Sequence, residues 1–321
     1  MDIFTHMTMG AASTHLALHK SLGKKAFVIG AIAGVFADID SFWYWPTTPI
    51  FNLLVHRSLT HSLLFVPFFA AFVAWILGKF FKKKGQEQSF RLLFLASFIS
   101  YLTHIFLDYT NSYGTYLFWP LSFERYYLDL FPIIDWLLSL PLFIFLFWAY
   151  KRNDWRIHLA SLAWFFSYLF LAFLQHEQVL KEQEKLILKR GQEAVKVRAI
   201  PTINNIFSWR SLYRTPTHVY ADKVVCFPLL LPKVEEGDSL VIARKEAMLT
   251  TYLNAELIDK NFSYFEKFTD GFVGFLPSEK ADTQVLGDLR YSRNLKGFDS
   301  RVRVEFDRNQ ALKAVKLIRY H

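Results

Sequence analysis

The sequence predicts an α-helical, polytopic membrane domain of about six helices, followed by a small, mostly β domain outside the cytoplasm. Hydrophobic residues make up 53% and aromatic residues 18% of the 321 residues, more than a soluble core needs, so part of the chain should lie in lipid. The apolar segments end near residue 175, and a charged helical segment and short alternating strands follow. We therefore predict a membrane domain over residues 1–176, a connecting helix over 177–199 and a soluble domain over 200–321.

Six apolar segments predict the membrane helices. Segments 63–81 and 91–109 come closest to the roughly 20 apolar residues that cross a bilayer. The other four cover residues 3–20, 26–45, 131–150 and 157–175. Residues spaced four apart predict that the first two helices have small-residue faces, on which helices pack closely. These faces are His6, Gly10 and Thr14 in one helix, and Ala26, Gly30, Gly34 and Asp38 in the other.

The charge and cysteine content exclude several classes of protein. The formal net charge is +9, but neither half of the chain has a concentrated basic stripe with interleaved aromatic residues. We interpret the basic surplus as a topology signal and an attraction to anionic membrane lipid, not as nucleic-acid binding. The single cysteine, Cys226, excludes an internal disulfide and a cysteine-ligated metal site.

The most distinctive stretch is His56-Arg57-Ser58-Leu59-Thr60-His61-Ser62, which places two imidazoles, a guanidinium and three hydroxyls beside an apolar segment. Imidazoles suit transition metals, and a guanidinium fits an anion such as phosphate. Two further clusters lie at a corresponding depth, Asp38-Ile39-Asp40 and the pair His104 and Asp108, which share one helix face with Ser100. A polar loop before a helix, or a His–Asp hydrogen bond between helices, would explain each cluster alone. Together they predict a metal site with the ligands His6, Asp38, His56, His61, His104 and Asp108.

The basic residues predict which side of the membrane these clusters face. Lysine and arginine gather in the connections around Lys24, Lys83 and Arg152, which the positive-inside rule places in the cytoplasm. Both termini and the connections 46–62 and 110–130 then lie outside. Eight ionisable groups consequently fall at the outer ends of their segments: His6, Asp38, Asp40, His56, His61, His104, Asp108 and Asp135. Because each charge at the bilayer centre costs about 2.5–3.5 kcal/mol, a shared polar cavity near the interface explains this best.

Mixed imidazole and carboxylate ligands without a thiolate suit zinc or a similar divalent ion, and open coordination positions suit catalysis. Two metals about 3.5–4 Å apart could clamp both oxygens of a phosphoester displacement. Arg57 and Asp40 are the catalytic candidates, with Arg57 holding a phosphate oxygen. Thr60 or Ser62 could orient the neighbouring histidines. Arg57 could instead pair with lipid headgroups or an acidic neighbour.

These residues, with Met1-Asp2-Ile3-Phe4-Thr5-His6, Gly10, Gly34 and Gly114, resemble the bacterial membrane-bound metal-dependent hydrolase family of the YdjM type. The resemblance covers roughly residues 1–140, and the region around Trp209 is similar more weakly. It implies a multi-pass protein of the bacterial inner membrane. The His/Asp pattern is similar to that of zinc-dependent phospholipase C and related nucleases, which implies a phosphoesterase acting on a lipid-like substrate.

The competing interpretation is a transporter or scaffold whose polar cluster binds an ion or fixes helix packing, because ionisable residues within a membrane also mark ion pathways. A pathway should continue through the bilayer, however, and the inner halves of the predicted spans are mostly apolar. This favours a site on one side of the membrane.

In the soluble domain, alternating residues predict strands over 217–220, 223–227, 239–243 and 301–306. Glu236-Gly237-Asp238 is a predicted turn between them.

Overall fold

The structure is a computed structural model, and it describes the chain except for residues 43–49, 51–53, 203, 250–254, 279–282, 292–301, 308–313 and 318–321. The described residues form two compact units. The first holds those of 1–43, 55–176 and 201–206, and the second holds those of 44–54, 177–200 and 207–321. The first unit is helical and the second is built on two β-sheets, which confirms a helical region followed by a small β-sheet domain.

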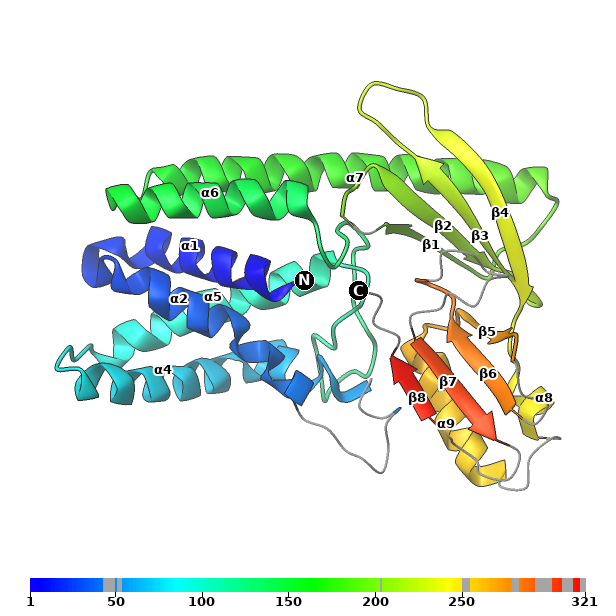
Figure 1. Ribbon diagram of the computed structural model, residues 1–321, viewed down its shortest axis with the longest axis horizontal. Coiled ribbons are helices and arrows are strands. Elements are labelled where there is room, and N and C mark those ends of the chain that lie inside the picture. The colour runs from blue at the N-terminus through cyan, green and yellow to red at the C-terminus, as the bar shows by residue number, and fades with distance from the viewer. Residues whose placement is uncertain are drawn as a thin grey trace. The chain divides into compact units, whose positions relative to one another are not determined.

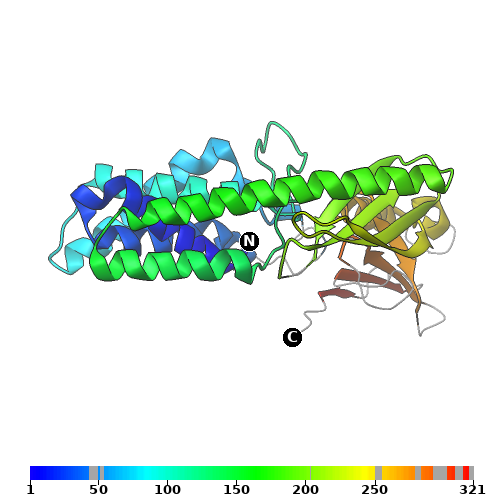
Figure 2. The ribbon, with the colours of Figure 1, turned by 90° about the horizontal axis from the view of Figure 1, so that it is seen from above.

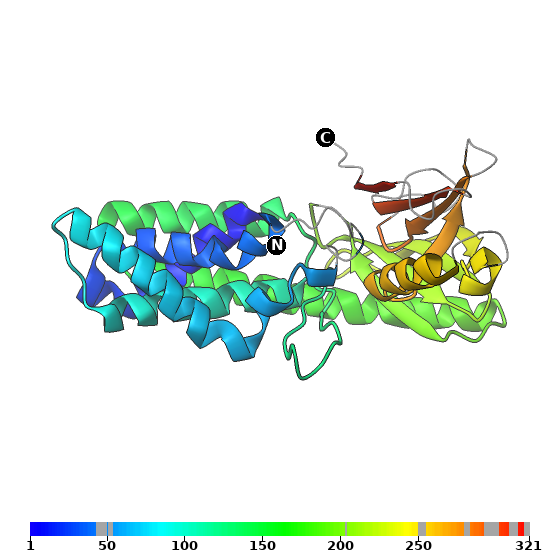
Figure 3. The same cartoon turned by 90° about the horizontal axis from the view of Figure 1, so that it is seen from below.

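The helices of the first unit are shown in Figure 1. They are α1 (Ile3–Leu22), α2 (Lys25–Val35), α4 (Val66–Lys83), α5 (Phe90–Thr110), α6 (Trp136–Arg152) and the first part of α7 (Ile157–Lys189). Short 3-10 helices, η1 (Phe36–Phe42), η2 (Leu59–His61) and η3 (Leu63–Phe65), lie between α2 and α4. Figure 2 shows α7 as one continuous helix, and Figure 3 shows α4 and α5 side by side.

Within the described residues, three helical segments are long and apolar enough to cross a membrane: Leu63–Lys83, Phe90–Thr110 and Ile157–Lys189. The prediction of about six membrane helices is therefore met by three candidates. The largest difference concerns the predicted span 26–45. Its α-helix, α2, has 11 residues and a length of about 16 Å, too short for a hydrocarbon core of about 30 Å. The chain continues as η1, and residues 43–45 lie outside the described part.

The predicted small-residue faces of α1 and α2 do pack closely. A Cβ atom on Gly10 would lie 2.5 Å from the carbonyl oxygen of Gly30, and one on Gly34 would lie 2.7 Å from that of His6. These helices also contact α5, where Ser100 Oγ donates a hydrogen bond of 2.6 Å to the Gly30 carbonyl. The apolar core beside the glycines joins α1, α2, α4 and α5 and includes Leu22, Ile29, Leu77, Phe81 and Leu93.

The second unit contains two four-stranded sheets. One has the strand order β1 (Lys196–Pro201), β2 (Ser208–Arg214), β3 (His218–Val225) and β4 (Lys233–Val241). The other has the order β5 (Val273–Leu276), β6 (Thr283–Asp288), β7 (Val302–Asp307) and β8 (Ala314–Leu317). Two helices, α8 (Lys245–Leu249) and α9 (Ala255–Phe268), lie between β4 and β5 in sequence.

The predicted strands 217–220 and 223–227 form a single strand, β3, and 301–306 corresponds to β7, although residue 301 lies outside the described part. The predicted turn Glu236-Gly237-Asp238 was wrong, since these residues lie inside β4. The β3–β4 register shifts between Ala221 and Lys223, where Asp222 accepts a hydrogen bond of 2.8 Å from Gly237 N. The Gly237 backbone lies so close to the Ala221 carbonyl that a Cβ atom at position 237 would overlap with it. The β-bulge at this position therefore requires glycine.

Candidate metal site

Four side chains of the first unit bring one ligand atom each to a common point: Asp38, His61, His104 and Asp108. His61 Nε2 lies 3.1 Å from His104 Nε2, 3.2 Å from Asp108 Oδ2 and 3.5 Å from Asp38 Oδ1. His104 Nε2 lies 3.4 Å from Asp108 Oδ2 and 3.6 Å from Asp38 Oδ1. The side chains of His61, His104 and Asp108 are fully buried, while that of Asp38 is 17% exposed.

The local folds of α2 and α5 explain this arrangement. Because α2 ends at Val35, the Gly34 carbonyl near its C-terminus is available to accept a hydrogen bond of 2.7 Å from His104 Nδ1. The 3-10 turns that follow then place Asp38 beside His104. His104 and Asp108 are one helical turn apart on α5 and reach the same point, as their spacing predicts.

Hydrogen bonds orient both imidazoles with Nε2 toward the common point. A carbonyl oxygen can only accept, so the contact with Gly34 places the proton of neutral His104 on Nδ1. Thr60 Oγ1 donates to Asp40 Oδ2 at 2.6 Å and therefore accepts from His61 Nδ1 at 2.9 Å. The neutral forms of both histidines thus direct a lone pair at the same point. Among the described residues, Asp108 Oδ2, buried beside them, has no hydrogen-bond partner.

These separations fit a four-coordinate metal. Bonds of about 2.0–2.1 Å in a tetrahedral site place neighbouring ligand atoms about 3.3 Å apart. The five separations given above run from 3.1 to 3.6 Å. Four facing acceptor atoms would repel one another unless a cation or protons lay between them. The donor set can therefore hold a metal ion.

The second oxygen of Asp108 is occupied by other groups. Asp108 Oδ1 lies 3.1 Å from the Arg57 guanidinium, 3.2 Å from His6 Nε2 and 3.2 Å from Asn111 Nδ2. The Met1 nitrogen contacts the same oxygen and lies 2.9 Å from His6 Nε2. Arg57 also donates to Asn111 Oδ1 at 3.2 Å. These contacts orient Asp108 so that Oδ2 faces the two histidines.

Asp40 holds the connection between η1 and η2 in place. Its carboxylate accepts from His56 Nδ1 at 2.8 Å, from the Arg57 backbone N–H at 2.9 Å and from Thr60 Oγ1 at 2.6 Å. The Arg57 bond matters because Arg57 has a φ of 65°, a left-handed conformation that costs a non-glycine residue energy. Asp40, Asp38 and His56 also form a second group that could hold a cation.

The structure divides the predicted site residues between the two groups and positions outside them. Asp38, His61, His104 and Asp108 share the first group, and His56 lies in the second with Asp40. His6 belongs to neither, but its ring stacks on that of His104 with centroids 3.7 Å apart. Arg57 is buried and pairs with an acidic neighbour, one of the two roles foreseen for it. Asp135 lies elsewhere, as the N-cap of α6, where it accepts from Leu137 N and Tyr168 Oη.

Sequence reasoning foresaw that Thr60 orients a histidine, but Ser62 instead donates to the Trp119 carbonyl at 2.6 Å. It missed the Gly34 carbonyl and Asn111. The end of α2 carries no capping glycine or proline that would have revealed a free carbonyl. Asn111 lies three residues beyond Asp108, at the C-cap of α5, and that spacing was the available signal.

The protonation of His61 leads to a testable pH dependence. Burial lowers the pKa of His61, but contacts with the carboxylates of Asp108, Asp38 and Asp40 outweigh burial and raise it to about 10. Without a cation this proton stabilises the fold fully below pH 6.5, and the stabilisation is lost as the pH rises through about 10. A metal must displace the proton, so its affinity should rise about tenfold per pH unit below that pKa.

We therefore expect the melting temperature of chelator-treated protein to fall as the pH rises from 6.5 toward 10, and that of metal-loaded protein to fall less. Thermal melting in detergent at several pH values measures the difference in melting temperature between metal-loaded and chelator-treated protein. If this difference became smaller as the pH rises, the proton would not lie on His61 as assigned.

Comparison with known proteins places the site within a family. The family model described as YdjM inner membrane protein matches residues 1–179, which include all four residues of the first group. A protein of Bacillus subtilis (strain 168) named "Uncharacterized protein YfhP" is 31% identical over 129 residues, 38% of this chain and 38% of that protein. The match thus spans less than half of that relative's length. No solved structure matches the chain.

Proposed function

Because the chain belongs to the YdjM inner membrane protein family, we propose that it is a membrane-bound, metal-dependent hydrolase that cleaves a lipid-like phosphoester. The single observation that carries this proposal is the convergence of two imidazole nitrogens and two carboxylate oxygens in a buried group. Nitrogen and oxygen donors in a small, nearly tetrahedral set suit zinc. With four protein donors in place, a divalent ion held there would take water as a fifth ligand, and it would then polarise a phosphoester and activate that water for attack.

His56 is the side chain that we propose to move the proton. It is 24% exposed, more than any other imidazole of the site, and its Nδ1 is bonded to Asp40. A histidine held by a carboxylate through one nitrogen presents the other for general acid–base catalysis. Asp40 then acts as a positioning residue. We assign Arg57 to holding Asp108, since its two terminal nitrogens already contact Asp108 and Asn111.

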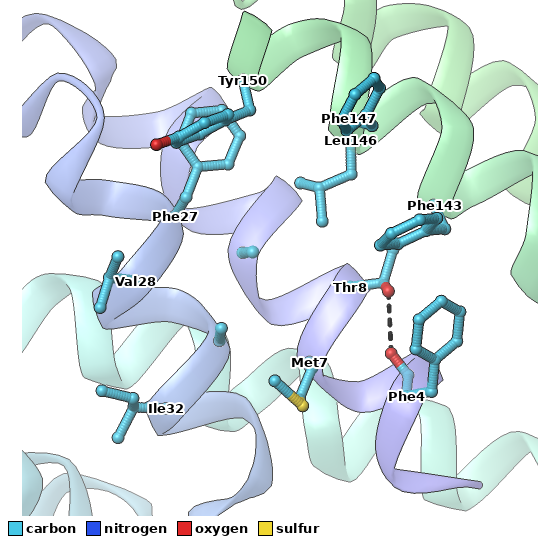
Figure 4. A pocket seen from close by; sticks show the side chains of 12 residues that line it. Phe4, Met7, Thr8, Phe27, Val28, Ile32, Phe143, Leu146, Phe147 and Tyr150 are labelled. Carbon is cyan, nitrogen blue, oxygen red and sulfur yellow. Dashed lines mark hydrogen bonds between the residues drawn. The ribbon is translucent and has the colours of Figure 1, made fainter.

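An apolar groove supports a substrate with an acyl chain. The groove has a volume of about 430 Å³ and runs along α1, α2 and α6 (Figure 4). It begins at Phe4 and Met7, on either side of His6 in sequence, and continues to Phe27, Phe143 and Tyr150. The hydroxyl of Thr8 in its wall is already bonded to the Phe4 carbonyl, so the wall offers little but apolar surface. A lipid tail is the occupant that such a wall accommodates.

We also propose that the protein is multi-pass, with the metal site and the second unit at the outer face of the bacterial inner membrane. Support comes from the basic residues at the opposite ends of the helices. Lys20 and Lys24 lie at the α1–α2 connection, and Lys82, Lys83 and Arg152 lie at the C-terminal ends of α4 and α6. The positive-inside rule assigns these ends to the cytoplasm.

The alternative is a transporter or scaffold in which the buried group binds an ion without chemistry. The residues packed between α1, α2, α4 and α5 favour the hydrolase over an ion path. Apolar side chains such as Ile29, Leu77 and Leu93 form the core there. The buried hydroxyls of Thr14 and Ser100 beside it donate to the carbonyls of Ala96 and Gly30. An ion path would need polar groups that are free to bind the ion along that depth, and these two hydroxyls are occupied.

The test is hydrolysis of phospholipids and of short-chain phosphodiesters by protein purified in detergent, with and without a chelator. We expect activity that the chelator abolishes and that zinc restores, with a preference for substrates that have an acyl chain. His56→Ala should lower turnover by about 100- to 10,000-fold while the ion of the first group, to which His56 is not a ligand, stays bound. Bound metal without activity across the panel would favour the alternative, and activity that resists chelation would exclude the metal from the reaction.

A further inference from the structure

The loop between β3 and β4 exposes an unusual concentration of leucine. Residues 226–232 connect the strands, and Figure 1 shows that this loop projects beyond the neighbouring strands of its sheet. Leu229 is 105% exposed, Leu230 62% and Leu231 92%, and Phe227 at the base is 47% exposed. Scattered exposed apolar residues are ordinary, but three consecutive exposed leucines at a loop tip indicate an interaction surface.

The backbone of the tip favours a different residue. Leu230 N donates to the Phe227 carbonyl at 3.2 Å, which closes a turn with Pro228 in its second position and Leu229 in its third. Leu229 has a φ of 65°. A turn with proline second and a positive φ third prefers glycine or asparagine in that third position, because they adopt it without strain. Leucine at position 229 is therefore unfavourable for two reasons: its side chain strains a backbone with positive φ, and the side chain is exposed to water.

The base of the loop is well fixed, so the exposure is not the result of a loose segment. Cys226 N donates to the Phe207 carbonyl at 2.8 Å, and the Phe227 ring stacks on that of Phe207 with centroids 5.3 Å apart. Lys223 and Lys233, 52% and 76% exposed, flank the loop on the two strands and share the exposed carboxylate of Glu235, which leaves one net positive charge there. The fold thus holds an apolar tip above a pair of ammonium groups.

We propose that this tip, Phe227 to Leu231, inserts into the interface of a lipid bilayer and anchors the second unit there. The apolar part of α7 precedes this unit directly in the chain, so the unit is tethered to a membrane. Leucines enter the acyl region, and flanking lysines lie at the depth of the lipid phosphates. Pro228 and Pro232 lack an N–H group, which lowers the cost of bringing the loop backbone into lipid.

The test places a fluorophore on the tip of the full-length protein in nanodiscs. A Leu230→Cys variant is labelled with an environment-sensitive maleimide, and quencher groups are carried on the lipid acyl chains. The native Cys226 does not interfere, because burial, with a smaller contribution from Glu182, raises the pKa of its thiol to about 11. Val241→Cys is the matched control. Val241 is 58% exposed and also apolar, but it lies at the opposite end of β4, roughly 26 Å along the strand.

We expect a blue-shifted emission at position 230 and lipid quenching about threefold or more stronger there than at position 241. Equal quenching at the two positions, with emission typical of water, would overturn the proposal. A label that is shielded from water but not quenched by lipid would also overturn it, because a protein partner or a second copy of the chain would then cover the tip.

A second variant separates insertion from a purely structural role. Leu229→Gly removes a leucine but suits the positive φ, so it should leave the melting temperature unchanged or raised. In a Leu230→Cys background it should lower the lipid quenching. Unchanged quenching would show that Leu229 does not contribute to anchoring, contrary to the proposal.

Discussion

Replacing Asp108 by asparagine should empty the metal site, with the affinity falling by at least about 100-fold. Loss of a hydrogen-bond partner behind a ligand alone costs about 10–100-fold, and this change removes a ligand charge itself. His61→Ala should have a similar effect, since it leaves three donors in place of four. Asparagine is preferred to alanine at position 108 because its oxygen can still face Arg57. A buried guanidinium left unpaired would cost a further 3–5 kcal/mol, roughly, and would confuse loss of metal with unfolding.

Two matched controls make the result specific. Asp135→Asn is the same chemical change at another fully buried carboxylate of the first unit. Asparagine is a good N-cap, so α6 should tolerate it and the metal content should stay full. His15→Ala removes a buried histidine that contacts His158 rather than the site. Metal content per protein after size-exclusion chromatography is the measurement. Equal loss in Asp108→Asn and Asp135→Asn would mean that the cluster does not hold the ion.

The sequence revealed those parts of the site that depend on local spacing. His104 and Asp108 lie four apart on a helix, so their convergence follows from helical geometry alone. Thr60 and His61 are adjacent, and that contact was also foreseeable. Asp38 was assigned to the metal ligands and Asp40 to catalysis, but the hydrogen bonds by which Asp40 holds the connection between η1 and η2 were not foreseen, because they depend on η1. A continuous α-helix through residue 45 would have turned these side chains to different directions than the 3-10 turns do.

The second unit was harder to predict for a different reason. In β2, Ser211 is buried together with Trp209, Leu212 and Tyr213, so burial does not follow apolar residue type and the alternation is obscured. In β4 the bulge at Gly237 looks like a turn in the sequence, since glycine between two acidic residues is typical of turns. The contact that makes it a bulge, with Ala221 and Asp222, comes from a neighbouring strand.

Replacing Gly30 by alanine should destabilise the first unit by about 1–3 kcal/mol or more, because an extra methyl group has no room there. Its Cβ would lie 2.7 Å from Thr14 Oγ1 and would overlap with the Gly10 carbonyl. The Gly10 carbonyl is backbone and cannot turn away, so α1 and α2 must separate. That separation should also weaken the metal site, since α2 supplies the Gly34 carbonyl that orients His104.

Gly78→Ala on α4 is the matched control for Gly30→Ala at the α1–α2 contact. It too is a glycine inside a helix, but of the described atoms its Cβ would meet only Leu93 Cδ1, at an ordinary 3.6 Å. Alanine there should be neutral or stabilise the helix by about 0.5–1 kcal/mol, as expected for a helix interior. Thermal melting of both variants in detergent, with metal content measured in parallel, tests the difference. If Gly30→Ala and Gly78→Ala shifted the melting temperature by the same amount, Gly30 would not be needed for the close packing of α1 and α2. If Gly30→Ala lowered the melting temperature but left the metal content unchanged, the α1–α2 packing and the metal site would be energetically independent.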